Sequence, residues 1–267
     1  MPIAALVRFS YASSVTIDLT KFEQGNPFNG DPDATLAALQ ERLARVQVAQ
    51  IVHRRRVIVL LEGWIGSGKK AALRRLIGSL DPVHVNVISA EQADDERHWL
   101  APFWSSLPAA GDISVFYRSW YYRIIEERIN GPTDDKRWSR ACDEVNEFEA
   151  QQCDHGTLVV KLFFHVAADQ QMARLRERHE DKWGRHLLSE EHFAGLGQRD
   201  QIIDALHDLF KLTDTRWAPW HVIDGNDERA SNIAALTAIV GQFEKAMPAE
   251  PPQEGETVVH FPQLKRG

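Results

Sequence analysis

The sequence contains little that would indicate a secreted, membrane-spanning or nucleic-acid-binding protein. It has only two cysteines, Cys142 and Cys153, whose spacing fits neither a disulfide framework nor a metal motif, so two packed thiols in a reducing cytosol are the simpler expectation. No run of about 18 apolar residues is present, and the N-terminus has a single early basic residue inside its short apolar patch, unlike a signal peptide. The net charge of -7 argues against non-specific attraction to nucleic acid. We therefore expect a cytoplasmic protein without membrane or nucleic-acid partners.

The composition fits one sizeable domain with an appendage at each end. The 267 residues are 43% hydrophobic and 26% charged, which suits a single globular core. Residues 1–30 are irregular and are expected to form an N-terminal extension, and residues 31–247 the domain itself. Residues 248–267 are rich in proline and glutamate, so we expect a flexible tail.

Short apolar runs alternate with helical patterns along the domain. The β-branched run Val57–Leu61 is typical of a buried parallel strand, and Asp31-Pro32 opens a helix whose leucines recur every three or four residues. This alternation predicts an α/β fold with a mostly parallel sheet. Further strands are expected at 84–90, 112–117, 157–166 and 220–224.

Glycines and a lysine follow the first predicted strand. Gly63, Gly68 and Lys69 satisfy the pattern G-x-x-x-x-G-K between a predicted strand and a predicted helix. Glycines let backbone N–H groups approach phosphate oxygens, the helix N-terminus adds positive potential, and the lysine neutralises charge. A glycine-rich turn with a merely solvated lysine is the alternative, but the strand–loop–helix context favours a phosphate site. The candidate phosphate-binding residues are Gly63, Gly66, Ser67, Gly68, Lys69 and Lys70.

The residue after Lys69 departs from the usual pattern. A standard loop has Ser or Thr there, whose hydroxyl binds Mg²⁺, whereas this chain has Lys70. A second positive charge suits a bound phosphate but cannot hold a cation.

Four ordered segments of the chain, from about Leu36 to Val240, resemble the polyphosphate kinase 2 family. They read "VIVLLEGWIGSGKKAALRRLIGSLDP", "HWLAPFWSSLPAAGDISVFYRSWYYRIIEERING", "EVNEFEAQQCDHGTLVVKLFFHVAADQQMARLRER" and "TDTRWAPWHVIDGND". The resemblance implies a P-loop kinase-like three-layer sandwich with a mostly parallel sheet and a helical lid. It also implies the family reaction, phosphoryl transfer between polyphosphate and nucleoside mono- or diphosphates.

The same resemblance implies roles for three cationic residues. Lys69 matches the family's loop lysine, Arg118 its arginine after the second acidic motif, and Arg178 its arginine at the entry of the lid. These three are the candidate catalytic residues, because the lysine and both guanidiniums would contact phosphate. A surface charge or an ion-pair member is the alternative for each arginine.

The departures from the family fall where the metal chemistry should be. The family's two aspartates correspond to Ile65 and Tyr117, and neither side chain offers a carboxylate oxygen for magnesium. We therefore predict no metal ligand at the family positions. Glu91 and Asp94 are candidate substitutes, although an acidic, solvated helix start is the plainer interpretation.

The lid region departs from the family as well. An ungapped alignment places Gly184, His186 and Leu187 at lid positions that are basic or aromatic in the family, but a small shift would recover Lys182 and Trp183. The alignment from Lys182 to Leu187 therefore stays open.

Three functions remain open at this point. The first is a family member that binds polyphosphate or nucleotide phosphates with weak or lost catalysis, a pseudoenzyme. The second is an active polyphosphate:nucleotide phosphotransferase with relocated metal ligands, for which Mg²⁺ would be the cofactor. An ordinary ATPase or small-molecule kinase that shares only the glycine loop ranks last, because it would leave the three later segments unexplained. The family also implies a homo-oligomer or a partnership with an active homologue, since some relatives carry two such domains in one chain.

Overall fold

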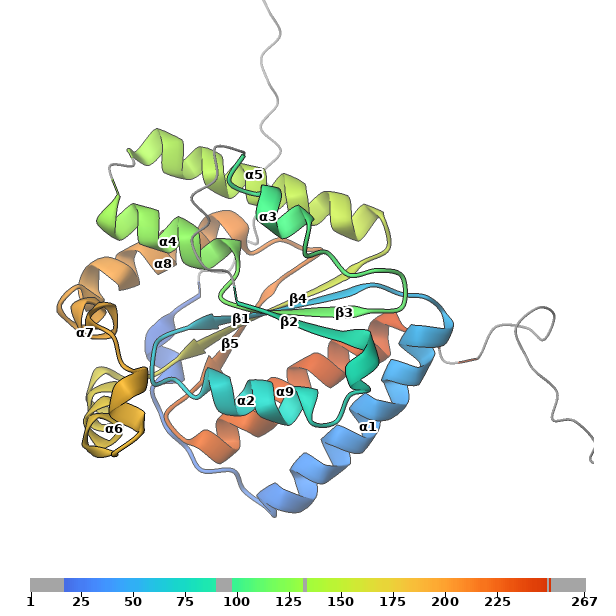
Figure 1. The fold of residues 1–267 in the computed structure, drawn as a ribbon, viewed down its shortest axis with the longest axis horizontal. Helices are drawn as coiled ribbons and strands as arrows, with labels where there is room; N and C mark the ends of the chain where they lie inside the picture. Colours follow the sequence, from blue (N-terminus) through green and yellow to red (C-terminus); the bar gives the residue numbers. More distant parts are fainter. Residues whose placement is uncertain (1–16, 90–97, 132–133, 249, 251–267) are drawn as a thin grey trace, which may run out of the picture.

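A computed structural model describes residues 17–89, 98–131, 134–248 and 250. Five strands form one parallel sheet in the order β2-β3-β1-β4-β5 (Figure 1). The predicted α/β fold is thereby confirmed, and each strand expected from the sequence is present. Their bounds are β1 Val57–Gly63, β2 Val85–Ile88, β3 Ile113–Tyr117, β4 Leu158–His165 and β5 Trp220–Asp224.

The central strand β1 fixes where its neighbours end. Val57 is in register with Ile113 of β3 and with Leu158 of β4, so the three strands run side by side and their carboxyl ends meet at one edge. Residues 57–62 of β1 are all buried, as expected for a strand covered on both faces. The sheet therefore delivers the residues that follow β1 and β3 to the same edge.

Helices cover both faces of the sheet and complete a three-layer sandwich (Figure 1). On one face Leu43 and Phe243 belong to the buried cluster, and on the other face Trp120 and Phe210 do. The first face carries α1 Pro32–Val52, α2 Lys69–Ile77 and α9 Glu228–Ala246. The second face carries α3 Ala101–Trp104, α4 Trp120–Asn130, α5 Asp135–Asp154 and α8 Arg199–Thr213.

Side-chain caps set the starts of the main helices. Asp31 accepts hydrogen bonds from the backbone N–H groups of Asp33 and Ala34, with Pro32 in the first turn, as the sequence predicts for α1. Ser119 caps α4 in the same way through the N–H of Tyr121. The α4 cap follows β3 directly, so it places the first turn of α4 at the carboxyl edge of the sheet.

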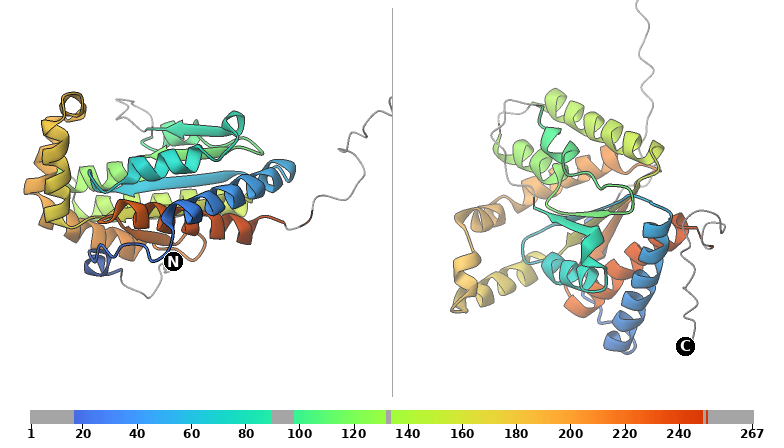
Figure 2. Two further views of the ribbon diagram at one scale, coloured as in Figure 1. Left: turned by 90° about the horizontal axis from the view of Figure 1, so that it is seen from below. Right: turned by 45° about the vertical axis from the view of Figure 1, so that its right-hand side comes forward.

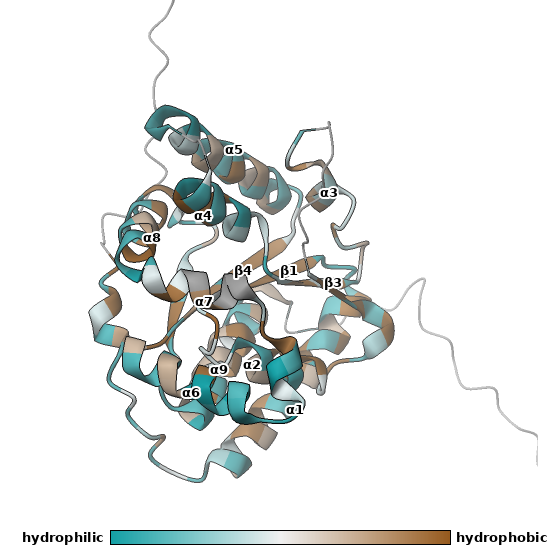
Figure 3. Cartoon of the chain, turned by 60° about the vertical axis from the view of Figure 1, so that its left-hand side comes forward, coloured by the Kyte–Doolittle hydropathy of each residue, from teal (hydrophilic) through white to brown (hydrophobic). Residues whose placement is uncertain are grey.

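A helical projection extends from that edge. It consists of α6 Ala168–Glu180, the 3-10 helix η3 Gly184–Leu187 and α7 Glu190–Gly197. Both views of Figure 2 show α6 and α7 standing out from one end of the molecule. Figure 3 shows that α6 is largely hydrophilic, whereas the central strands are hydrophobic. Near the tip, Trp183 is 75% exposed.

The described part of the N-terminal segment packs onto the domain. Residues 17–30 include the 3-10 helix η1, Leu19–Phe22, which contacts β5. Leu19 is only 2% exposed and belongs to the second-face cluster. A further 3-10 helix, η2 Pro82–His84, precedes β2. In the described part of the chain no helix combines the length and apolarity that crossing a membrane would require.

Candidate anion-binding site

The glycine loop, residues 63–69, is tightly enclosed by two neighbouring backbones. Gly63 has φ 127°, and a Cβ there would lie 2.2 Å from the carbonyl oxygen of Phe164. From the other side, a Cβ at Gly225 would lie 2.5 Å from the carbonyl oxygen of Ser67. The loop therefore needs glycine on itself and on the turn after β5, and no larger residue fits at either position.

Lys69 is the first residue of α2 and is buried in the loop. Its Nζ donates a hydrogen bond to the carbonyl oxygen of Gly63 at 2.6 Å, and the residue is 7% exposed. Burial lowers the pKa of Lys69 from 10.5 to about 8, Glu62 opposes this decrease, and the charge of Arg118 adds to it. One carbonyl satisfies only one of the three N–H donors of the ammonium group. Lys69 can therefore donate to an anion.

The carboxylate of Glu62, whose charge acts on Lys69, has a structural role. It is 2% exposed, and its Oε1 accepts a hydrogen bond from the backbone N–H of Ser119 at 2.5 Å. Burial raises the pKa of Glu62, and Lys69 is the main opposing influence. Since Ser119 caps α4, Glu62 ties the start of that helix to the end of β1.

Tyr117 ends β3 and faces the loop lysine with its ring. Lys69 Nζ lies 5.2 Å from the ring centroid, within the range of a cation–π contact. Burial raises the pKa of Tyr117, and the positive charges of Arg118 and Arg178 oppose that rise. The sequence prediction set Tyr117 at a family aspartate position. The structure places a neutral aromatic ring against Lys69 there.

Arg118 and Arg178 add positive charge near this ring, and Lys70 follows Lys69 in the first turn of α2. Arg118 has φ 72°, a strained value for a non-glycine residue, and its guanidinium stands 4.7 Å from the ring centroid of Tyr122. Among the described residues, Arg118, Arg178 and Lys70 have no ion-pair partner. Lys70 is exposed, whereas both arginines are half-buried. The site is locally positive in a chain of net charge -7.

The described residues around the loop do not offer the ligands that a magnesium ion prefers. Mg²⁺ prefers carboxylate and water oxygens in octahedral geometry, and Ile65 and Tyr117 supply neither carboxylate. Within residues 17–89, 98–131 and 134–248, no group of three or more His, Cys, Asp or Glu side chains could hold a metal. The candidate substitutes Glu91 and Asp94 lie outside the described residues.

Arg174, which the sequence analysis missed, holds the loop from the base of the projection. Its guanidinium donates to three backbone carbonyls, those of Gly66, Gly225 and Asn226, each at 2.7 Å. One turn earlier on α6, Gln171 donates to the carbonyl of Ile65 at 3.0 Å. The i, i+4 spacing of Arg174 and Arg178 on α6 was the available signal. It could not show that the two side chains have different tasks.

A second support reaches the loop from the N-terminal segment. Trp64 donates from Nε1 to Nδ1 of His165 at 2.9 Å, and Nε2 of His165 lies 2.9 Å from Glu23. Burial lowers the pKa of His165, and Glu23 opposes this decrease. Arg199 covers the Trp64 ring at 4.3 Å. Because Nδ1 accepts from Trp64, the arrangement needs neutral His165.

The structure brings most of the predicted site residues together. Lys69 lies over the ring of Tyr117, and the charges of Arg118 and Arg178 act on the same side chain, so these four residues gather at the carboxyl edge beside the glycine loop. Ser67 is buried, and its hydroxyl has no hydrogen-bond partner in the described part of the chain.

In the described part of the chain, no hydrogen bond, ion pair or ring contact joins residues 182–187 to the glycine loop. Nζ of Lys182 lies 5.7 Å from the ring centroid of Trp183. Asp181 accepts hydrogen bonds from the backbone N–H groups of Trp183 and Gly184. The open lid alignment is therefore not resolved by a contact to the loop.

The chain is similar in sequence to known proteins. The chain is 34% identical over 214 residues to the polyphosphate:AMP phosphotransferase of Pseudomonas aeruginosa, covering 79% of this chain and 43% of that protein. It is 28% identical over 231 residues to the GDP-polyphosphate phosphotransferase of Mycolicibacterium smegmatis, covering 84% of this chain and 82% of the relative. The chain thus spans less than half the length of the first of these relatives.

Solved structures show the same fold. A polyphosphate kinase 2 structure from Pseudomonas aeruginosa matches with a TM-score of 0.79 and 31% identity over 86% of this chain and 50% of that one. The polyphosphate kinase 2 of Arthrobacter aurescens matches with a TM-score of 0.84 at 24% identity, over 96% of each chain. The sequence model of Polyphosphate kinase 2 covers residues 29–251. The chain therefore belongs to the polyphosphate kinase 2 family.

Proposed function

We propose that this protein binds polyphosphate or nucleotide phosphates at the glycine loop and transfers phosphoryl groups weakly or not at all. The observation that carries the proposal is the pairing of Lys69 with the ring of Tyr117. With tyrosine at position 117, the positive charges around the loop remain, but the carboxylate that a metal ion would need is missing.

Binding is supported by the donors that stay open at the site. Lys69 uses one N–H on Gly63, and neither Arg118 nor Arg178 has an ion-pair partner in the described part of the chain. Arginine forks match the geometry of phosphate oxygens, and charge-assisted hydrogen bonds are about twice as strong as neutral ones. An extended polyanion could engage all three cations at once.

Weak transfer is supported by the missing carboxylates. Phosphoryl transfer depends on positioning and on neutralising charge between two polyanions. Losing an electrostatic element of this kind costs on the order of 10³-fold in rate. Glu62 does not compensate, because its carboxylate is buried and committed to Ser119.

The alternative is an active polyphosphate:nucleotide phosphotransferase that uses Mg²⁺ through Glu91 and Asp94. The relatives named above carry out such transfers, but Glu91 and Asp94 lie outside the described residues. We also propose that the protein works in the cytoplasm, as a homo-oligomer or beside an active homologue.

The deciding experiment measures binding and turnover in the same samples. Labelled polyphosphate is titrated into the protein, and transfer to AMP, ADP, GMP and GDP is assayed with Mg²⁺ or Mn²⁺. Lys69→Ala should abolish binding. Lys245→Ala removes the same charge from the last turn of α9, away from the glycine loop, and should leave binding unchanged. Metal-dependent turnover that Lys69→Ala abolishes would establish the alternative instead.

A gain-of-function pair sharpens the test. Ile65→Asp combined with Tyr117→Asp restores both acidic side chains, so Mg²⁺ should then alter the affinity for polyphosphate, an effect we do not expect for the unmodified chain. Equal magnesium dependence in both proteins would contradict the proposal. Ile65→Asn with Tyr117→Asn is the matched control, since it changes size similarly without adding charge.

A further inference from the structure

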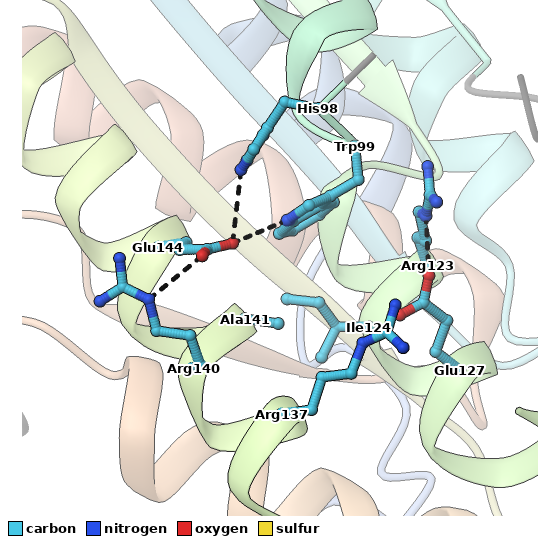
Figure 4. Close-up of a pocket in the computed structure, with 9 residues that line it drawn as sticks. All are labelled: His98, Trp99, Arg123, Ile124, Glu127, Arg137, Arg140, Ala141 and Glu144. Carbon is cyan, nitrogen blue, oxygen red and sulfur yellow. Dashed lines mark hydrogen bonds and ion pairs between the residues drawn. The ribbon is translucent and has the colours of Figure 1, made fainter. Parts of the chain in front are cut away.

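A pocket of about 230 Å³ lies between α4 and α5, away from the glycine loop contacts. Figure 4 shows its residues, with Trp99 on one side and Ile124 at its centre. Ile124 is 2% exposed and, with Ala141, forms an apolar floor. The rim carries charged side chains from both helices. This combination of floor and rim suits a small planar ligand with polar edges.

The aromatic wall of the pocket is held in place. Trp99 donates from Nε1 to Glu144 at 2.8 Å, and Arg140 donates from Nε to the same carboxylate at 3.1 Å. His98 Nε2 lies 3.7 Å from it. Each carboxylate oxygen of Glu144 thus accepts a hydrogen bond, and Glu144 fixes the indole plane before any ligand binds.

A cation lies over the indole of Trp99. The Arg123 guanidinium lies 5.9 Å from the Trp99 ring centroid, and its Nε donates to Glu127 at 2.9 Å. Bases in DNA stack about 3.4 Å apart, so a base between two flat groups needs about 7 Å. Arg123 is a flexible side chain, and a movement of about 1 Å would admit a base between it and Trp99.

The polar groups that remain open match one kind of base. Arg137 lines the pocket and has no ion-pair partner among the described residues, and Glu127 uses only Oε1 in its hydrogen bond with Arg123. Guanine offers the acceptors O6 and N7 to an arginine fork, and N–H donors on its other edge to a carboxylate. Adenine has an amino donor where guanine has O6, so it cannot accept both bonds of an arginine fork.

We propose that this pocket binds a guanine base, stacked on Trp99 and read by Arg137 and Glu127. Arg118 directly precedes Ser119, the cap of α4, and Arg123 lies in the first turn of the same helix, so the phosphates of a guanine nucleotide would extend toward the cations of the loop. For the phosphate end, this inference rests on the function proposed above. For the base end, it stands on the pocket alone.

The test uses guanosine and adenosine, which lack phosphate, titrated into the full chain by calorimetry. Guanosine should bind at least about tenfold more tightly than adenosine, in line with one bidentate base contact. Arg137→Gln should lose that preference. Lys136→Gln removes the same charge from the neighbouring residue of α5, which does not line the pocket, and should keep it. Equal affinity for the two nucleosides, or equal effects of the two variants, would overturn the proposal.

Two further variants keep the result independent of folding and of the loop. Trp99→Leu should lose guanosine binding and Trp99→Phe should recover it, because phenylalanine keeps a stacking face. Lys69→Ala should leave guanosine affinity unchanged while polyphosphate binding is lost. Guanosine binding without polyphosphate binding in the unmodified chain would refute the loop function alone, and the reverse would refute the base site alone.

Discussion

Two buried lysines of this protein, Lys69 and Lys161, are held in opposite ways. Lys161 lies in β4 with its side chain fully buried, and its Nζ donates to Glu149, the hydroxyl of Tyr121 and the carbonyl of Thr213 at 2.7–3.0 Å. By contrast, Nζ of Lys69 donates to one carbonyl, that of Gly63, and lies over one aromatic ring, that of Tyr117. All three donors of Lys161 are used, whereas those of Lys69 are not.

This difference separates a structural charge from a candidate binding charge. Glu149 also accepts from Trp120 and Tyr121, so the Lys161 network has no opening for a ligand. Burial lowers the pKa of both lysines, but at Lys161 a carboxylate in direct contact opposes the decrease. A buried lysine with unused donors at the start of a helix is thus a better candidate for a binding residue than burial alone would indicate.

The largest expected effect is on Lys161. Lys161→Met leaves the Glu149 carboxylate buried without its cation, which should destabilise the fold by roughly 3–5 kcal/mol. Urea unfolding followed by circular dichroism measures the loss. Adding Glu149→Gln to the same chain should recover part of it, and no recovery would mean that the pair is not coupled.

The same substitution at Lys69 should have the opposite sign. The decrease of the pKa from 10.5 to about 8 corresponds to a cost of about 3 kcal/mol for keeping the buried ammonium charged. Lys69→Met should therefore stabilise the ligand-free protein, by less than that amount because buried Glu62 loses its opposing positive charge, while polyphosphate binding is lost. A destabilisation as large as that of Lys161→Met would show that the two lysines play the same role.

The pH dependence follows from the same decrease. The unfolded chain keeps the Lys69 proton up to pH 10.5 and the folded chain only up to about pH 8, so between these values the unfolded state binds more protons and stability rises with pH. Affinity for polyphosphate should fall over the same range, because the ammonium is lost. Urea midpoints and binding titrations from about pH 7 to about pH 9.5 test both slopes, and Lys69→Met should remove both.

The smallest effect concerns the ring beside Lys69. Tyr117→Leu removes the cation–π contact, worth about 0.5–1 kcal/mol at a partly exposed site. The pH midpoint of polyphosphate binding should therefore move down by less than about one unit. Tyr117→Phe keeps the ring and should leave the midpoint in place. A shift of equal size in both variants would indicate that the hydroxyl, not the ring, acts on Lys69.

The sequence predicts the sheet well because its signals are local. The β-branched run at Val57–Leu61 and the Asp31-Pro32 cap depend on neighbours along the chain, and the structure confirms both elements. The glycine loop is likewise found between a strand and a helix. The binding roles of its residues stay predictions, because no described contact tests them.

The remaining features could not be read from the sequence because they depend on distant contacts. Glu23 meets His165 across 142 positions, and Arg174 meets Gly66 across 108. Nothing in the local pattern around Arg174 distinguishes it from Arg178, since both occupy one basic helix. The contact of Tyr117 with Lys69 also required the register of β1 and β3.

The three carbonyl bonds of Arg174 locate the pivot of the helical projection. The Arg174 guanidinium on α6 donates to carbonyls of both the glycine loop and the turn after β5. A rotation of the whole helix would therefore break three charge-assisted hydrogen bonds together. The first part of α6 should therefore move with the sheet as one rigid body. Bending is left to the segment after Glu180, where Asp181 ends the helix and Gly184 follows. The tip can then travel while the base stays fixed.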